Sequence, residues 1–482
     1  MAEEQKHTTP PPADSPPTTS TPASTVGSTT NSRPGTPTLN GSSIADKNVA
    51  PDGKAQDDTS KLRTFLSILK KFIGVTDIAA VRFSLPAQLM EPVPNLEYWN
   101  YLDRPESFAA MGDSDDEVGR MLEVLRFWFT KDLKYVKGKP CKPYNSTLGE
   151  FFRCTWNVED PAQFADDDDS KPKAQEVLKA AKAGEKLKYP LKVSYLTEQT
   201  SHHPPVSAFV YDCPEKGINA RGYDQLSAKF TGTSVRVVPG QFNKGIFVTL
   251  SKRDNEEYQL THPAAYLGGF IRGNLNVTVS DTCYVTCPKT GIKVLLHYAE
   301  EGYFGKTQNK VEGVIYRPDN LEADKASKIS DVSEKNVLGR LEGCWKDKVY
   351  YAAGSSPSWK KVSDKDKIML IDLNPLVQAQ KQAPPLDQQL LNESRRFWND
   401  VTEAILARQY STATAKKQEL EEAQRQKANQ RQEKEKKWQP RFFTTVTESN
   451  GKPEVSEAGT AAVKGLHSGD YHLEEPQEYG AF

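Results

Sequence analysis

The chain has 482 residues, and its 63 lysines and arginines almost cancel its 64 aspartates and glutamates, leaving a formal net charge of −1. This balance gives no electrostatic reason to expect a nucleic-acid-binding protein. The six cysteines are scattered without a CxxC pair, which is typical of reduced thiols in a cytosolic protein. No run approaches the roughly 18 apolar residues of a membrane span and no apolar leader is evident, so we expect any membrane contact to be peripheral.

The two ends of the chain differ in composition from its centre. Among the first 50 residues, 28 are Pro, Thr, Ser or Gly, and the first Phe, Tyr or Trp of the chain is Phe65. Such a segment cannot bury enough apolar surface to offset its conformational entropy. We therefore expect a disordered tail at 1–57, a folded domain at 58–440, and a second polar, disordered tail at 441–482.

The domain should begin with a helix at about 60–75, because apolar residues recur there at helical spacing. Gly74 can end this helix, and its basic residues lie largely outside the apolar face. The segment is therefore either a helix packed on a core or a basic amphipathic helix that touches a membrane or covers a cavity. Its apolar face consists of Leu62, Phe65, Leu66, Leu69, Phe72 and Ile73.

Strand patterns dominate the centre of the chain, at about 140–375. Residues 271–279 alternate between apolar and polar, as a half-buried strand does. Many strands without intervening helices favour an antiparallel sheet large enough to close into a barrel. Helical patterns return at about 385–440, so we predict a mainly β fold with helices. Further strand-like runs lie at 293–298, 311–317, 337–345, 348–353 and 367–373.

The densest polar motif is EQTSHHPP at 198–205, between two strand-like runs. Adjacent histidines before two prolines make a stiff turn, because proline fixes φ and restricts the residue before it. Rigid imidazoles can bind a metal, act in acid–base catalysis or donate hydrogen bonds to an anion. The sequence supplies neither the spacing of further metal ligands nor a GxSxG nucleophile. We therefore expect no metal, cofactor or catalytic residue. The motif either donates hydrogen bonds to an anion or is a simple turn at the end of a strand.

EQTSHHPP resembles the signature of the oxysterol-binding protein family. The resemblance spans about 64–443 and is most similar to the short, single-domain fungal members. It implies a large, nearly closed antiparallel β-barrel around a lipid tunnel, with an amphipathic lid helix over its mouth and helices at the C-terminal end. Other stretches that carry the resemblance are KPYNSTLGEFF (142–152), GYDQLSAKF (222–230), ESRRFWNDV (393–401) and KKQELEEAQR (416–425).

The resemblance also implies a site for the headgroup of phosphatidylinositol 4-phosphate (PI4P) at the tunnel entrance. Cations would supply charge there and rigid donors would supply geometry. Lys417, Glu421 and Arg425, which match this site, share a helix face, where they can equally form surface ion pairs. The residues that match this site are Lys142, Asn145, His202, His203, Lys417, Glu421 and Arg425.

Three further residues match the family's sterol tunnel, namely Trp99, Asp224 and Gln241. Trp99 can also be an ordinary core aromatic. Asp224 stands where the short fungal members have Asn, and burying an ionised carboxylate is costly. Family members that carry phosphatidylserine keep the same PI4P residues, so the motif leaves the second cargo open.

These features predict a monomeric, cytosolic lipid-transfer protein. The resemblance implies that it binds PI4P and a sterol, such as ergosterol or cholesterol, in one tunnel. It would exchange them between anionic membrane surfaces at contact sites of the ER, Golgi or plasma membrane. The alternatives are a phosphatidylserine/PI4P exchanger, a PI4P- or sterol-dependent regulator with little net transfer, and a lipid hydrolase that uses the histidine pair.

Overall fold

The computed structural model of the chain describes Gly53 and residues 58–81, 85–138, 142–164, 187–270, 275–300, 308–356 and 358–474. The predicted tail at 1–57 lies outside these residues, except for Gly53. The strands are β1 (Phe151–Glu159), β2 (Pro190–His202), β3 (Pro205–Cys213), β4 (Ile218–Asp224), β5 (Leu226–Phe230), β6 (Val235–Pro239), β7 (Ile246–Leu250), β8 (Glu256–Leu260), β9 (Ala264–Gly268), β10 (Asn276–Cys287), β11 (Ile292–Tyr298), β12 (Lys310–Tyr316), β13 (Val337–Cys344), β14 (Lys348–Ala353) and β15 (Ile368–Asp372). The helices are α2 (Asp58–Leu69), α3 (Asn95–Tyr98), α4 (Pro105–Ala109), α5 (Glu117–Thr130), α6 (Leu133–Lys137), α8 (Leu321–Asp324), α9 (Ser394–Phe397), α10 (Asn399–Leu406), α11 (Tyr410–Glu433) and α12 (Glu457–Ser468).

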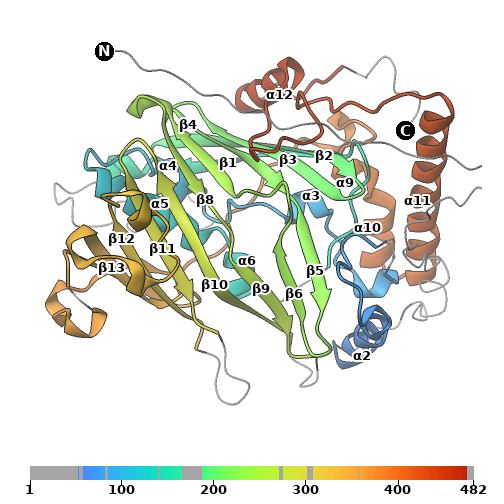
Figure 1. Ribbon diagram of the computed structural model, residues 1–482. Coiled ribbons are helices and arrows are strands. Elements are labelled where there is room, and N and C mark those ends of the chain that lie inside the picture. The colour runs from blue at the N-terminus through green and yellow to red at the C-terminus, as the bar shows by residue number, and fades with distance from the viewer. Residues whose placement is uncertain are drawn as a thin grey trace, which may run out of the picture. The chain divides into compact units, whose positions relative to one another are not determined.

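The described strands form one sheet of 15 strands, and neighbouring strands pair antiparallel (Figure 1). Its main order is β1-β2-β3-β4-β7-β8-β10-β11-β12-β13-β14-β15. A branch leaves this path, because β10 also pairs with β9, β9 with β6, and β6 with β5. Among the described residues β1 and β15 do not pair, so the sheet is not closed. The predicted large antiparallel sheet with helices is confirmed.

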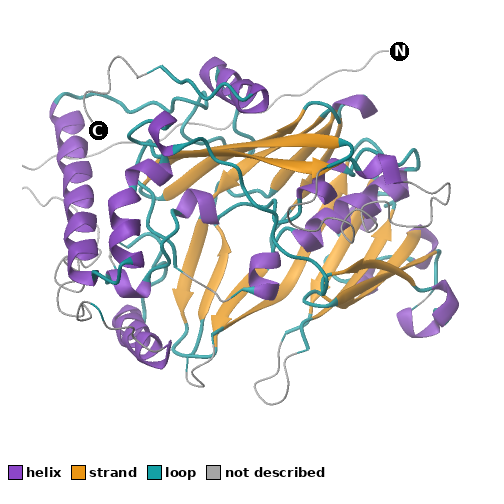
Figure 2. Ribbon diagram, turned by 180° about the vertical axis from the view of Figure 1, so that it is seen from behind, coloured by secondary structure: helices purple, strands orange, loops and turns teal. Residues whose placement is uncertain are grey.

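Helices α4 and α5 form one core with the sheet, and Figure 2 shows helices lying against the sheet from behind. Helix α5 starts at Asp116, whose carboxylate accepts a hydrogen bond of 2.7 Å from the backbone N–H of Gly119. Phe127 is fully buried in the resulting core. Each large apolar side chain buried in this way stabilises the fold by roughly 1.5–3 kcal/mol. The buried ion pair of Arg120 with Glu256, at 2.8 Å, ties α5 to β8.

The prediction of a disordered tail at 441–482 is wrong for residues 441–474. These residues include α12, which packs on β1 and β2 (Figure 1). Ala462, Val463 and Leu466 lie on one helical face and are buried. Because the segment is polar on average, its composition predicts disorder. Its few apolar residues are nevertheless spaced to cover a sheet face. Residues 475–482 lie outside the described part of the chain.

Glu198, the first residue of the EQTSHHPP motif, holds this C-terminal segment against β2. Its side chain is buried, and its two carboxylate oxygens accept hydrogen bonds of 2.8 Å from the backbone N–H groups of Arg441 and Phe442. Burial raises the pKa of Glu198 to about 7, although both hydrogen bonds favour the ionised form.

We predict that this carboxyl makes stability depend on pH. Its pKa rises from about 4.5 in the unfolded chain to about 7 in the fold, so the folded state binds the proton more tightly. The stability that this carboxyl contributes is therefore highest below its pKa in the unfolded chain, about 4.5. It is lost as pH rises through its pKa in the fold, about 7. The wild-type free energy of unfolding should fall relative to that of Glu198→Gln by about 1–3 kcal/mol between pH 5 and pH 8.

Denaturant unfolding at both pH values measures this difference. Glu433→Gln, at an exposed position on α11, is the matched control and should follow the wild type. A difference between wild type and Glu198→Gln that stays constant across the range would contradict the prediction.

Candidate functional site

One face of the sheet branch is apolar throughout. Residues directly opposite each other on paired strands point to the same face. Val235 lies opposite Phe230 and Leu267, and Val237 lies opposite Ala228 and Ala265. The same face continues onto β10, where two valines pack against the core cluster. Its members are Leu226, Ala228, Phe230, Val235, Val237, Ala265, Leu267, Val277 and Val279.

The side chains of this apolar sheet face are only partly covered. All of them except Phe230 and Val235 are half-buried, whereas most residues of β1 to β3 are buried. The opposite face is polar, and there the Arg236 Nε–H donates to the Tyr266 hydroxyl at 3.1 Å. An apolar face that protein covers only partly is suited to contact an apolar ligand.

Helix α2 lies at one end of the apolar sheet face, beside the lower ends of β5 and β6 in Figure 1. The Phe65 ring lies 5.9 Å from that of Phe270, which in turn lies 6.5 Å from that of Phe230. The chain after the helix is tied to β5, because the Ile78 N–H donates to the Ala228 carbonyl at 2.7 Å. The predicted helix is therefore present, at Asp58–Leu69, and is anchored at this end.

The structure corrects one residue of the predicted lid face. Leu62, Leu69 and Phe72 are buried, and Phe65 and Leu66 are half-buried. Ile73 is instead 64 % exposed. Its backbone is extended (φ −60°, ψ 127°), so the helical periodicity that predicted an inward side chain no longer applies.

The loop that carries Lys142 and Asn145 is held by buried side chains. Lys142 Nζ donates to Asn145 Oδ1 at 2.6 Å. Between them, the buried Tyr144 ring stacks on Trp398 at 4.8 Å. Glu150 accepts hydrogen bonds from the Thr147 N–H at 2.9 Å and from the Trp398 Nε1–H at 3.2 Å. The loop is thus anchored to the C-terminal helices.

The two histidines of the motif sit in a tight hairpin between β2 and β3. Their ring centroids lie 4.5 Å apart, and His203 is exposed while His202 is half-buried. The same end of β2 is bonded to the loop after Asn145, because the Gly149 N–H donates to the Gln199 carbonyl at 3.0 Å. The fold therefore brings the histidine hairpin and the Lys142 loop to one region.

On helix α11 Lys417 and Glu421 form an ion pair, which Arg425 does not share. Lys417 is only 2 % exposed, and its Nζ donates to Glu421 Oε1 at 2.8 Å. Arg425 is exposed and pairs with Glu422, its Nε lying 2.8 Å from Oε2. Eight residues exceed two turns of 3.6 residues, so Arg425 is rotated away from Lys417.

The three predicted sterol residues have different surroundings. Trp99 is half-buried, with its ring 6.2 Å from that of Tyr135. Asp224 Oδ1 accepts a hydrogen bond of 2.5 Å from the Tyr101 hydroxyl, and burial raises the Asp224 pKa to about 7. Gln241 is exposed in the turn after β6. This exposure does not fit a tunnel-lining side chain, so we do not include Gln241 among the proposed sterol contacts.

A cluster of side chains beside Asp224 was not predicted from the sequence. The Tyr101 ring stacks on that of His262, with centroids 5.2 Å apart and planes at 20°. Lys131 is buried, pairs with Asp132 and lies 4.2 Å from the centroid of the Trp128 ring. Burial, together with the charge of Lys131, lowers the pKa of His262 to about 3. These residues come from separate elements without motif spacing, so no sequence pattern joins them.

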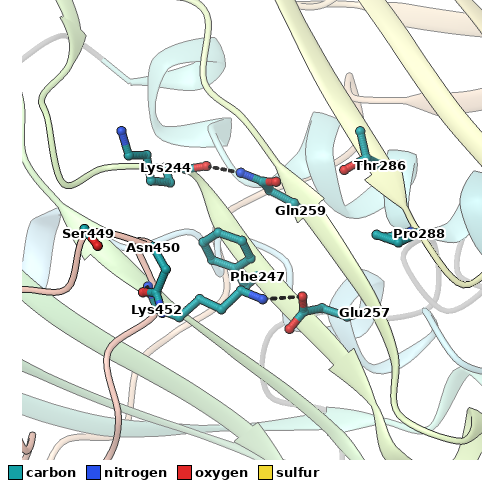
Figure 3. Close-up of a pocket in the computed structure, with 9 residues that line it drawn as sticks. All are labelled: Lys244, Phe247, Glu257, Gln259, Thr286, Pro288, Ser449, Asn450 and Lys452. Carbon is teal, nitrogen blue, oxygen red and sulfur yellow. Dashed lines mark hydrogen bonds and ion pairs between the residues drawn. The ribbon is translucent and has the colours of Figure 1, made fainter. Parts of the chain in front are cut away.

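A separate pocket lies on the outer side of the sheet, between β7, β8 and the loop at 449–452 (Figure 3). Lys452 Nζ lies 4.7 Å from the Phe247 ring centroid and 2.5 Å from a Glu257 oxygen. The pocket contains none of the predicted site residues, and this cation already has a partner. Nothing about it points to a particular ligand.

Within the described ranges, no group of three or more His, Cys, Asp or Glu side chains could hold a metal ion. None of the helices in these ranges has the length and apolar character needed to cross a bilayer.

Comparisons with known proteins identify relatives over most of the chain. The sequence profile of the family described as oxysterol-binding protein matches residues 64–463. The chain is 41 % identical over 500 residues to Oxysterol-binding protein-like protein 1 of Schizosaccharomyces pombe, covering 88 % of this chain and 95 % of the relative. It is 28 % identical to Oxysterol-binding protein-related protein 9 of Homo sapiens, covering 82 % of this chain and 48 % of that protein.

Solved structures share the fold. The Osh1 ORD domain in complex with ergosterol has a TM-score of 0.62 at 19 % identity, covering 89 % of this chain and 92 % of that chain. The Osh3 ORD of Saccharomyces cerevisiae in complex with PI(4)P has a TM-score of 0.56 at 17 % identity, covering 88 % and 96 %. These likenesses support the sheet architecture, while the profile and the S. pombe relative show the family. The chain belongs to the oxysterol-binding protein family, whose members bind lipids.

Proposed function

We propose that this chain is a lipid-transfer protein that binds a sterol or PI4P, one at a time, and exchanges them between membranes. The observation that carries the proposal is the half-buried apolar sheet face with helix α2 anchored at its end. The related folds support it, because one was solved with ergosterol and another with PI(4)P. The protein would act without covalent chemistry, from the cytosol and in transient contact with membranes.

The apolar sheet face would receive the sterol rings or the acyl chains. Each Å² of apolar surface removed from water contributes about 25 cal/mol, which offsets the loss of the lipid's contacts in the bilayer. Helix α2 would have to move for a lipid to enter, and such opening commonly limits the rate of exchange. The exposed Ile73 lies just beyond the helix, after Lys70 and Lys71, and would face the membrane at that moment.

The headgroup of PI4P would bind where the histidine hairpin meets the Lys142 loop. Lys142 supplies charge, His202 and His203 supply rigid donors, and Asn145 supplies an amide. Lys417 would join them from α11, with Glu421 orienting it at 2.8 Å. Arg425 would take part only after leaving Glu422. A PI4P gradient between the two membranes would give the exchange its direction.

We predict that His202→Ala/His203→Ala impairs PI4P extraction. The double variant removes two donors from the headgroup site but leaves the apolar sheet face intact. PI4P extraction from liposomes should fall at least tenfold, since each charge-assisted hydrogen bond is worth roughly 1.5–3 kcal/mol. Sterol transfer to acceptor liposomes without PI4P should stay within about twofold of wild type, and acceleration by acceptor PI4P should disappear.

The matched control is His297→Ala, an exposed histidine on β11 that lies outside the proposed site. Undiminished PI4P extraction by the double variant would refute the headgroup site. PI4P extraction by the wild type without any sterol movement would refute the sterol cargo and favour phosphatidylserine. A wild type that extracts neither lipid would refute transfer itself.

A second prediction concerns the lid. Phe65→Ala removes the ring that contacts Phe270, so bound sterol should escape faster. Loss of about 1–2 kcal/mol of lid packing corresponds to roughly 5- to 30-fold faster release. Release of a fluorescent sterol into cyclodextrin measures this rate without a membrane. Ile73→Ala, at an exposed position of the same segment, should release sterol at the wild-type rate. Equal rates for Phe65→Ala and wild type would argue against α2 as the lid.

A further inference from the structure

Helix α2 and the turn that follows it have two chemically different faces. The inward face is packed, because the side chains of Ile68, Leu69 and Phe72 are buried. The outward face is defined by the residues of 60–74 that are exposed, and most of them recur at helical spacing. The packing of the inward face fixes which side chains point to solvent. The outward face consists of Ser60, Arg63, Ser67, Lys70, Lys71, Ile73 and Gly74.

The outward face is basic. Residues 60–74 contain four lysines and arginines and neither Asp nor Glu. Three of these cations, Arg63, Lys70 and Lys71, are exposed. Next to an anionic bilayer each such residue strengthens binding roughly fivefold, and salt weakens the effect. The outward face is therefore suited to approach an anionic membrane.

Ser67 lies in the middle of these cations. Arg63 stands four residues before it, and Lys70 and Lys71 stand three and four residues after it. Helix α2 continues into a 3₁₀ turn at Lys70–Phe72, so residues at these separations are neighbours on one side. The Ser67 side chain is exposed, and its hydroxyl donates to the Thr64 carbonyl at 2.8 Å. The Ser67 oxygen is therefore accessible from solvent and lies in a positive electrostatic field.

We infer that Ser67 is a phosphorylation site for a protein kinase that selects serines between basic residues, and that its phosphate weakens the binding of α2 to anionic membranes. The kinase would transfer the γ-phosphoryl group of ATP to the Ser67 oxygen, releasing ADP and the hydroxyl proton. The inference rests on the proposed function, because it assumes that α2 approaches the membrane when it opens. The same opening would free the segment to enter the active site of a kinase.

The phosphate would change the charge of the outward face. It carries about −1.5 to −2 charges at pH 7, which offsets up to two of the three exposed cations. Its oxygens can accept charge-assisted hydrogen bonds from Arg63, which would then be less available to lipid headgroups. The inward face and the contact of Phe65 with Phe270 would stay as they are. Phosphorylation would thus slow lipid exchange at anionic membranes without altering the site that holds the cargo.

The first experiment tests the modification itself. The purified full-length chain is incubated with ATP and protein kinase C, and the modified residues are identified by peptide mass spectrometry. The wild type should gain a phosphate on Ser67, and Ser67→Ala should lack the corresponding phosphopeptide. A wild type without phosphate on Ser67 would overturn the assignment of this residue as the modification site.

The second experiment measures binding to vesicles by flotation. Ser67→Glu adds a negative charge, whereas Ser67→Gln has the same size and no charge, so their comparison isolates the charge. On vesicles that contain phosphatidylserine, Ser67→Glu should bind about fivefold more weakly than Ser67→Gln, and the phosphorylated wild type roughly tenfold or more below the unmodified protein. On vesicles of phosphatidylcholine alone, the variants and both forms of the wild type should bind alike.

Ser363→Glu is the matched control, because it adds the same charge at an exposed serine in the segment before β15. It should bind as the wild type does, and melting temperatures show whether each variant folds. Equal binding of Ser67→Glu and Ser67→Gln to phosphatidylserine vesicles would overturn the inference, as would a wild type that binds both kinds of vesicle alike. A wild type that binds anionic vesicles but transfers neither sterol nor PI4P would instead refute the proposed function, and the comparison of the Ser67 variants would still decide the effect of the charge.

Discussion

The apolar face formed by β5, β6, β9 and the first half of β10 must be kept from water, and the rest of the proposed site depends on how this is done. Protein covers that face only partly, since seven of its nine side chains are half-buried. Helix α2 lies at one end, where Phe65 contacts Phe270, and a polar cluster around Asp224 lies at the other. In the proposed function, the apolar part of a lipid would cover the remaining surface and so complete its burial. The same surface would bind sterol rings or acyl chains, so two cargoes would compete for it.

Two buried carboxyl groups connect the Lys142 loop and β2 to other parts of the fold. Glu150 anchors the loop after Asn145 to Trp398, and Glu198 anchors residues 441–442 to β2. Burial raises the pKa of both carboxyl groups to about 7. Each group therefore destabilises the folded state relative to the unfolded state as pH rises. Both carboxyl groups keep backbone or side-chain donors satisfied that would otherwise be orphaned. We infer that they hold the histidine hairpin and the Lys142 loop in place before a phosphate arrives.

The sequence predicts the fold where patterns are local. The runs at 293–298 and 348–353 become β11 and β14, and the charged stretch after residue 412 lies in α11. Prediction from the sequence fails where contacts between distant parts of the chain determine the structure. The C-terminal segment is polar overall yet buries Ala462, Val463 and Leu466 against the sheet. The motif points to the histidine hairpin, whereas the contact between Tyr101 and His262 joins residues that are far apart in the chain and follow no spacing rule.

The central claim is that one apolar surface serves both lipids in turn. Native mass spectrometry of sterol-loaded protein after exposure to PI4P liposomes tests it most directly. The account predicts chains with one sterol or one PI4P, and a loss of sterol that matches the gain of PI4P. A species that carries both lipids on one chain would contradict it, because the apolar sheet face could not then be the shared site.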